Sequence, residues 1–147
     1  MSSNPMEGSP RGAYYVSVAN HAQPGKAPGM RVQLLTSEGA EPRQYAVIFG
    51  KGDEVASGLA EFAQRYHLTS AHFTGVGALQ DVTVAWMDRE KKSYKAIPIP
   101  QQVEVLSLIG DVAMFEGKPA VHAHLVVGLD DASAKGGHLI EAHVFPT

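Results

Sequence analysis

The stretch AVHAHLVVGLDDASAKGGHLIEAHVFPT, residues 120–147, predicts the β-hairpin around which the rest of the chain is arranged. Its first arm is apolar, its second arm starts at His138, and the polar tract between them, closed by two glycines, is typical of a turn. His122 and His124 are two residues apart, so a strand projects both imidazoles to the same side. If His124 lies opposite His138, with Asp131 at the tip, all three rings converge on one point.

Three converging imidazoles are the donor set of a catalytic-type zinc site, in which a fourth position stays open for water or a substrate. A structural interpretation stands beside this one, because histidines in strands also serve as hydrogen-bonded or solvent-exposed groups. A β-bulge in the turn would also send His138 to the opposite face. The spacing therefore predicts a candidate metal site at His122, His124 and His138 and leaves the structural interpretation open.

The composition predicts one folded domain with a polar segment before it. The chain has 147 residues, of which 44% are hydrophobic and 18% charged, and this suits a single globular domain. Residues 1–29 are rich in Ser, Pro, Gly and Asn, and such a composition buries too little apolar surface to offset its ordering entropy. We therefore expect a flexible N-terminal extension over residues 1–29, with a short strand at residues 14–18, and a folded domain over residues 30–147.

Several classes of protein are disfavoured by the same composition. The chain has no cysteine, which excludes disulfides, thiolate zinc sites and cysteine nucleophiles. No apolar run approaches the roughly 20 residues that cross a bilayer, and the N-terminus lacks the features of a signal peptide. We expect a cytoplasmic protein that does not associate with membranes. A formal net charge of −3 is unlike the basic surface typical of proteins that bind duplex DNA.

Hydrophobic periodicity predicts one helix and about seven or eight strands. Asp53 has the chemistry of a helix N-cap, and apolar residues at helical spacing follow it, so we expect a helix over residues 54–66. Besides the arms of the hairpin, period-two patterns predict strands at residues 31–35, 44–49, 70–74, 82–87, 93–98, 103–110 and 111–115. The glycines of residues 75–78 favour a bulge over a phosphate-binding turn. One helix among strands joined by tight turns indicates an α+β fold with a largely antiparallel sheet.

A metal held by three histidines gains chemistry from a nearby acid or base. Glu104, a carboxylate in an otherwise apolar strand, is the candidate catalytic residue, and the alternative is a strand-end carboxylate that faces solvent. Glu141 and His143 have the opposite parity to His138 and are expected outside the site.

The remaining histidines receive weaker interpretations. His72 precedes the glycine-rich bend and could line a pocket, although a hydrogen-bonded core histidine is the preferred reading. His21, in the N-terminal segment, and His67, at the end of the helix, are assigned no role.

Several blocks of the chain resemble the plants-and-prokaryotes-conserved (PPC) domain family. They follow one another in order between residues 30 and 147: GDEV at 52–55, HFTGVGAL at 72–79, VEVLSLIG at 103–110, VHAH at 121–124 and GGHL at 136–139. The resemblance implies a compact α+β domain with a strongly curved, mostly antiparallel sheet and one main helix, assembled as a homotrimer. Members of the family usually continue beyond the position of Thr147 into a final strand, so a closing strand is expected to be missing here or the sheet edge to be open.

The family fold is similar to part of acetolactate decarboxylase, a zinc enzyme whose metal is held by three histidines. Residue by residue, the resemblance implies that His122, His124 and His138 are the ligands of a divalent metal, zinc.

Three functions are compatible with these features. The first, which we expect, is a metal-binding homotrimer that acts on or senses a small oxygen-rich molecule. The second is a DNA-associated protein, because plant relatives join this domain to AT-hooks and bacterial relatives are often labelled DNA-binding. Residues 9–12 hold a single arginine and do not form an AT-hook. The third is an assembly module with a non-catalytic metal.

Overall fold

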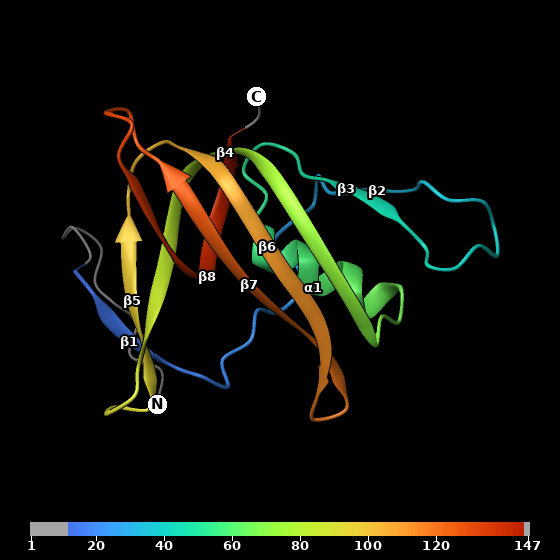
Figure 1. The fold of residues 1–147 in the computed structure, drawn as a ribbon, viewed down its shortest axis with the longest axis horizontal. Coiled ribbons are helices and arrows are strands. Elements are labelled where there is room, and N and C mark those ends of the chain that lie inside the picture. The colour runs from blue at the N-terminus through green and yellow to red at the C-terminus, as the bar shows by residue number, and fades with distance from the viewer. Residues whose placement is uncertain (1–11, 146–147) are drawn as a thin grey trace.

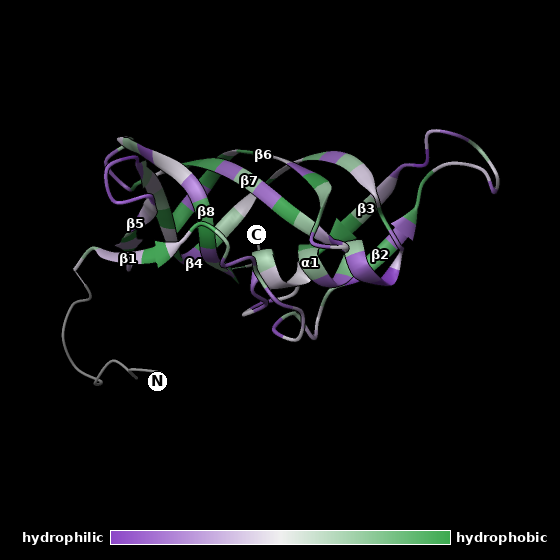
Figure 2. Cartoon of the chain, turned by 90° about the horizontal axis from the view of Figure 1, so that it is seen from below, coloured by the Kyte–Doolittle hydropathy of each residue, from purple (hydrophilic) through white to green (hydrophobic). Residues whose placement is uncertain are grey.

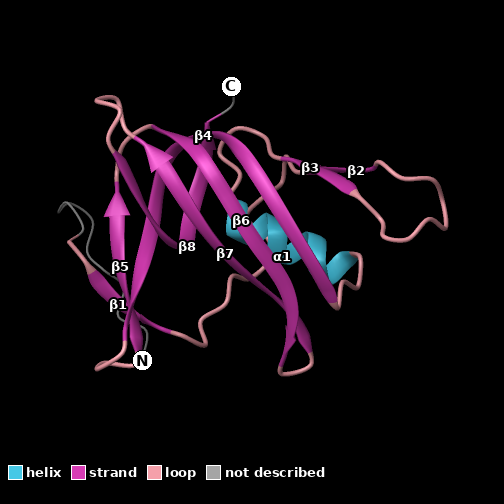
Figure 3. Cartoon of the chain, viewed as in Figure 1, coloured by secondary structure: helices cyan, strands magenta, loops and turns pink. Residues whose placement is uncertain are grey.

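The computed structural model describes residues 12–145, which form eight strands and one helix (Figures 1 and 3). In chain order the elements are β1 Tyr14–Ser17, β2 Arg31–Leu34, β3 Tyr45–Ile48, α1 Val55–Arg65, β4 Ser70–Asp88, β5 Ser93–Ile99, β6 Val103–Phe115, β7 Lys118–Gly128 and β8 Ala134–Phe145. The predicted α+β class is confirmed. No helix in the described part of the chain is long and apolar enough to cross a membrane.

Six strands form one antiparallel sheet in the order β1-β5-β4-β6-β7-β8, and β2 and β3 pair separately. The sheet closes on itself because β4 pairs with β6 along its first part and with β8 and β5 along its later part. At Ala78 and Leu79, β4 is hydrogen-bonded to β6 on one side and to β8 on the other. Figure 1 shows the resulting strong curvature, which the resemblance noted in the sequence implies.

The glycine-rich bend of β4 is a bulge, as predicted. The register of β4 against β6 shifts between Gly75 and Gly77, and Gly77 has φ +152°, a conformation that side-chain-bearing residues rarely adopt. The bulge bends β4 without ending it. Residues 70–88 are therefore a single 19-residue strand, where the sequence pattern predicted two strands.

The helix α1 covers the inner face of the curved sheet. Val55 and Leu59 of α1 join a buried core with Leu125, Val127 and other strand residues. Figure 2 shows hydrophobic and hydrophilic residues alternating along the strands, as expected of a sheet with one buried face. The outer face carries the alternate residues of β6 and β7, most of which are exposed.

The N-terminus of α1 is capped by Glu54, so the predicted cap at Asp53 is wrong. The Glu54 carboxylate accepts hydrogen bonds from the N–H groups of Ala56 at 3.0 Å and Ser57 at 2.7 Å. It also accepts one from the N–H of Ala142 at 2.8 Å, which ties the helix to β8. Asp53 is buried just before the helix, and there its carboxylate binds loop N–H groups instead.

The residues before the domain also make defined contacts. The short strand predicted at residues 14–18 is confirmed as β1, which pairs with β5 from Tyr14↔Ala96 to Ser17↔Ser93. The flexibility expected of residues 1–29 stays a prediction. Residues 1–11, with most of the arginine-containing stretch, and residues 146–147, after which a closing strand was expected in the family, lie outside the described residues.

Candidate metal centre

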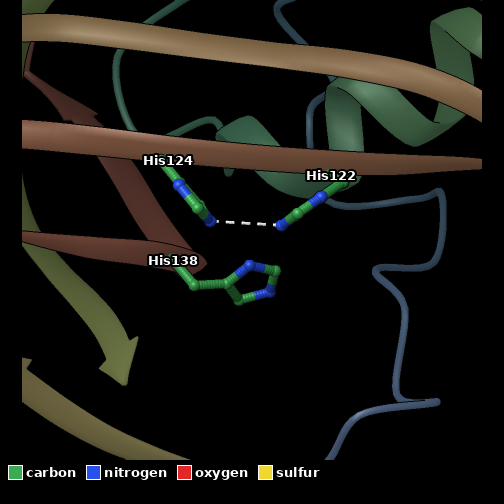
Figure 4. A group of neighbouring side chains, drawn as sticks. All are labelled: His122, His124 and His138. Carbon is green, nitrogen blue, oxygen red and sulfur yellow. Dashed lines mark hydrogen bonds between the residues drawn. The ribbon is translucent and has the colours of Figure 1, made fainter. Parts of the chain in front are cut away.

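The three histidines of the β7–β8 hairpin converge, as the sequence predicts. His124 lies directly opposite His138, and His122 precedes His124 by two residues on the same face of β7. The Nε2 atoms of His122 and His124 are 3.2 Å apart. One ring nitrogen from each of the three histidines lies within 4.8 Å of the others. Figure 4 shows the three rings turned toward one another.

His138 is the most enclosed member of the group. Its Nδ1 atom is buried and has no hydrogen-bond partner among the described residues. Burial first, and then the charges of His122, His124 and His21, lower the pKa of His138 from 6.5 to about 4. His138 is therefore neutral at neutral pH, the state in which an imidazole nitrogen donates to a metal.

A tyrosine holds the plane of this ring. Tyr94, on β5, stacks on His138 with ring centroids 4.2 Å apart and an interplanar angle of 8°. Tyr94 was not singled out from the sequence, because the contact depends on β4 lying between β5 and β8 in the sheet. Ala85 of β4 lies opposite both Ala96 of β5 and His138 of β8. Once this pairing is known, Tyr94, two residues before Ala96 on the same face of β5, is expected near His138.

The donors fit a tetrahedral metal of the zinc type. Zinc binds imidazole nitrogen at about 2.0–2.1 Å, which puts two such ligands about 3.3 Å apart. The separation of His122 and His124 is 3.2 Å. A buried nitrogen with no partner on His138 supplies the third donor. Because His122 and His124 are exposed, a fourth position can be reached by solvent or a small ligand.

The structure does not bring Glu104 to the histidines within one chain. Glu104 is exposed on β6 and lies opposite Gly128, four residues beyond His124 on β7. At ~3.3 Å per residue, this corresponds to about 13 Å along the strand. The carboxylate that lies beside the site is that of Asp111, directly opposite His122 on β6. Its position follows from the register of the β6–β7 hairpin, which sequence spacing alone did not supply.

The other candidate residues from the sequence are not part of the histidine cluster. His72 is exposed and lies opposite Asp111, so the core-histidine interpretation is wrong. Glu141 and His143 lie outside the cluster, as expected. The Nδ1 atom of His143 is 2.8 Å from Oδ1 of Asp81, and its Nε2 atom is 3.5 Å from Oε1 of Glu141.

His67 is exposed just after α1, away from the cluster. His21, which was assigned no role from the sequence, lies in the segment after β1, and its charge is the smallest of the causes that lower the pKa of His138.

A groove of about 340 Å³ lies on the outer face, over β4 and β6, and none of the three histidines lines it. Val76, Leu106 and Ile109 line this groove and are 87%, 56% and 60% exposed. Ile109 also lies directly opposite His124, so this apolar face borders the histidine cluster.

The family model of the Plants and Prokaryotes Conserved (PCC) domain matches residues 36–147. No similar protein was found among curated proteins.

Three solved structures have the same fold. A plant- and prokaryote-conserved (PPC) protein of Pyrococcus horikoshii is 31% identical, covers 79% of this chain with 73% of its own length, and has a TM-score of 0.64. A metal-containing protein of Archaeoglobus fulgidus is 28% identical over 81% of this chain and 74% of its own, with a TM-score of 0.62. A protein of Ralstonia eutropha, described as a candidate DNA-binding protein, is 30% identical over 76% and 74%, with a TM-score of 0.67.

Proposed function

The chain belongs to the Plants and Prokaryotes Conserved domain family, and from this premise we propose that it binds a divalent metal, zinc, through His122, His124 and His138. The observation that carries the proposal is the convergence of three imidazole nitrogens within 4.8 Å. The buried Nδ1 of His138 without a partner supports it, since an orphaned polar atom costs free energy unless something binds it. A similar protein of Archaeoglobus fulgidus that contains metal supports it further.

The ligand set also favours a class of small molecule. Three neutral imidazoles leave the 2+ charge of the metal uncompensated, so an oxygen donor with negative charge is attracted to the open position. A metal there lowers the pKa of bound water or polarises a carbonyl. We therefore propose that the site binds or acts on a small oxygen-rich molecule. Asp111, opposite His122, is the nearest carboxylate by register, ahead of Glu104, and could serve as the base within one chain.

We propose assembly as a homotrimer through the outer face of the sheet. Val76, Leu106, Ile109 and Val126 are exposed there. Large exposed apolar patches on soluble domains mark surfaces that bind protein. Because this face borders His124 through Ile109, assembly would also change the surroundings of the metal.

DNA association and a structural role with a non-catalytic metal are the two alternative functions for this fold. Similarity to the Ralstonia eutropha protein supports DNA association, but the net charge of −3 opposes it. A salt-dependent shift of duplex DNA at near-physiological ionic strength would favour that function. A structural module with a non-catalytic metal would bind the metal but show no ligand at its open position.

Metal analysis of the purified full-length protein tests the proposal. We expect about one zinc per wild-type chain, and almost none in the His122→Ala/His124→Ala double variant, because a single remaining imidazole cannot hold the ion. His67→Asn is the matched control, since it removes an exposed histidine away from the cluster and should keep full occupancy. Wild-type protein without a stoichiometric divalent metal, even after incubation with zinc, would contradict the proposal.

A further inference from the structure

The side chain of Tyr94 crosses a whole strand to reach the histidine cluster. Ala85 of β4 lies opposite Ala96 of β5 and His138 of β8, so β5 and β8 flank β4 (Figure 1). Tyr94, two residues before Ala96, lies on the same face of the sheet as His138. Two strand spacings of about 4.8 Å each separate β5 from β8. The rings of Tyr94 and His138 are nevertheless stacked, with centroids 4.2 Å apart, so the tyrosine extends across β4.

Small side chains on β4 and β5 leave room for this crossing. Ala85 and Ala96 share the face over which the tyrosine extends, and they are only 4% and 0% exposed, as expected where a large ring lies above them. Larger side chains stand directly beside the tyrosine, since Val16 of β1 and Met87 of β4 both lie opposite Tyr94. The ring is therefore directed over the two alanines and toward β8.

This direction brings the hydroxyl of Tyr94 to the cluster. The hydroxyl oxygen is the side-chain atom farthest from the backbone of β5, so it lies on the β8 side of the ring, beside His138. One ring nitrogen of His138 lies within 4.8 Å of those of His122 and His124. Within residues 12–145 the Tyr94 hydroxyl forms no hydrogen bond, unlike that of Tyr15, which donates to Asp88 at 3.3 Å. A polar donor is thus available beside the candidate metal centre.

We propose that the Tyr94 hydroxyl donates a hydrogen bond to a small carboxylate bound at the open position of the metal centre. The inference rests on the proposed function and adds a residue that recognises the ligand. A carboxylate suits both partners, since one oxygen binds the metal and the other accepts the O–H in a charge-assisted hydrogen bond. The stack on His138 then has two effects, because it orients a metal ligand and holds the donor beside it.

Acetate titrated into cobalt-loaded, full-length protein tests this inference, because the visible absorption of bound Co²⁺ reports both metal occupancy and a change of ligand. Tyr94→Phe removes the hydroxyl and keeps the stacked ring. We expect it to bind acetate about tenfold more weakly than wild type, the effect of one lost hydrogen bond to a charged group. Tyr15→Phe is the matched control, since it removes a tyrosine hydroxyl on the opposite face of the sheet and should bind acetate like wild type.

A second probe, imidazole, separates recognition by the hydroxyl from a general change at the site. Once one nitrogen of imidazole binds the metal, the ring offers an N–H donor and no acceptor. Its affinity should therefore be the same in wild type and Tyr94→Phe. An equal loss of acetate and imidazole affinity would overturn the inference, because it would assign the hydroxyl a structural role.

Cobalt stoichiometry on the same samples separates this inference from the metal site itself. We expect one Co²⁺ per chain in wild type and in both variants. An acetate dissociation constant in Tyr94→Phe equal to that of wild type would overturn the inference, as would loss of cobalt from this variant or cobalt-loaded wild type that binds no acetate. Failure of wild-type protein to bind cobalt at all would instead refute the proposed function.

Discussion

The state of the His138 side chain suits the proposed metal site. Its Nδ1 is buried without a partner, and its ring is fixed by Tyr94 at a centroid distance of 4.2 Å. The lowered pKa, about 4, keeps the imidazole neutral at neutral pH, so no proton must be released before it can donate to a metal. The buried nitrogen without a hydrogen-bond partner costs free energy in the folded state, and a metal bound to it would offset that cost.

Replacing Tyr94 with alanine should weaken metal binding without removing a ligand. Without the stack, the ring of His138 gains rotational freedom and must be ordered on binding. We expect zinc affinity to fall about tenfold, as for other residues that orient a metal-ligating histidine. Tyr94→Phe keeps the ring and should bind zinc like wild type. Competition with a chromophoric chelator measures both constants, and equal affinity of Tyr94→Ala and wild type would show that the stack does not position His138.

The convergence of His122, His124 and His138 could be predicted from the sequence because it depends on local geometry. The i, i+2 spacing of His122 and His124 fixes their common face, and a tight hairpin restricts which residues can face His138. Asp111 and Tyr94 could not be found in the same way, because they reach the cluster through pairing with other strands.

Long strands are the elements that the sequence pattern described least well. The pattern divides β4 at Gly75 and β6 after Gly110, yet both strands continue, because a bulge or a close contact preserves pairing where the period is interrupted. At Gly110 an added Cβ would collide with the ring of Phe73 and lie 2.7 Å from the carbonyl oxygen of His122, so this glycine makes room for Phe73 and β7 rather than ending β6. The helix was predicted well, since its 3.6-residue period is local.

The junction of β4 and β8 carries a pH-dependent contribution to stability. Burial lowers the pKa of His143, but the hydrogen bond and charge of Asp81, together with the charges of Glu141 and Glu54, outweigh burial and raise it. A histidine whose pKa is higher in the folded than in the unfolded state stabilises the fold fully below about pH 6.5. That stability is lost as the pH rises through the folded-state pKa.

Replacing His143 with glutamine should therefore destabilise the protein more in acid than in base. We expect the unfolding midpoint of His143→Gln to lie a few degrees below that of wild type at about pH 6, and the two to converge by about pH 9. The effect is modest because the pair is partly solvent-exposed. Thermal unfolding of metal-free protein at both pH values measures it, and the comparison cancels the opposite contribution of His138. A difference that grows with pH would contradict the assignment.

The inner and outer faces of the curved sheet carry different kinds of residues. The inner face packs on α1 and forms the core, whereas the outer face carries the histidines and the exposed apolar residues together. That division follows from the period of two along β6 and β7, and the sequence could predict it. The sequence could not predict that β4 closes the sheet by pairing with both β6 and β8, because such a register depends on contacts between distant strands.

Substituting the exposed apolar residues of the outer face should disrupt assembly. We expect wild-type protein to have about three times the 15.7 kDa mass of one chain by light scattering at micromolar concentration. Leu106→Glu/Ile109→Glu should be monomeric, since buried unpaired carboxylates in each interface would cost several kcal/mol. Leu35→Glu, which replaces an equally exposed leucine beyond β2, is the control and should remain assembled. A wild-type monomer would contradict the proposed homotrimer. If the double variant remains a trimer, the interface does not lie on the face that borders His124.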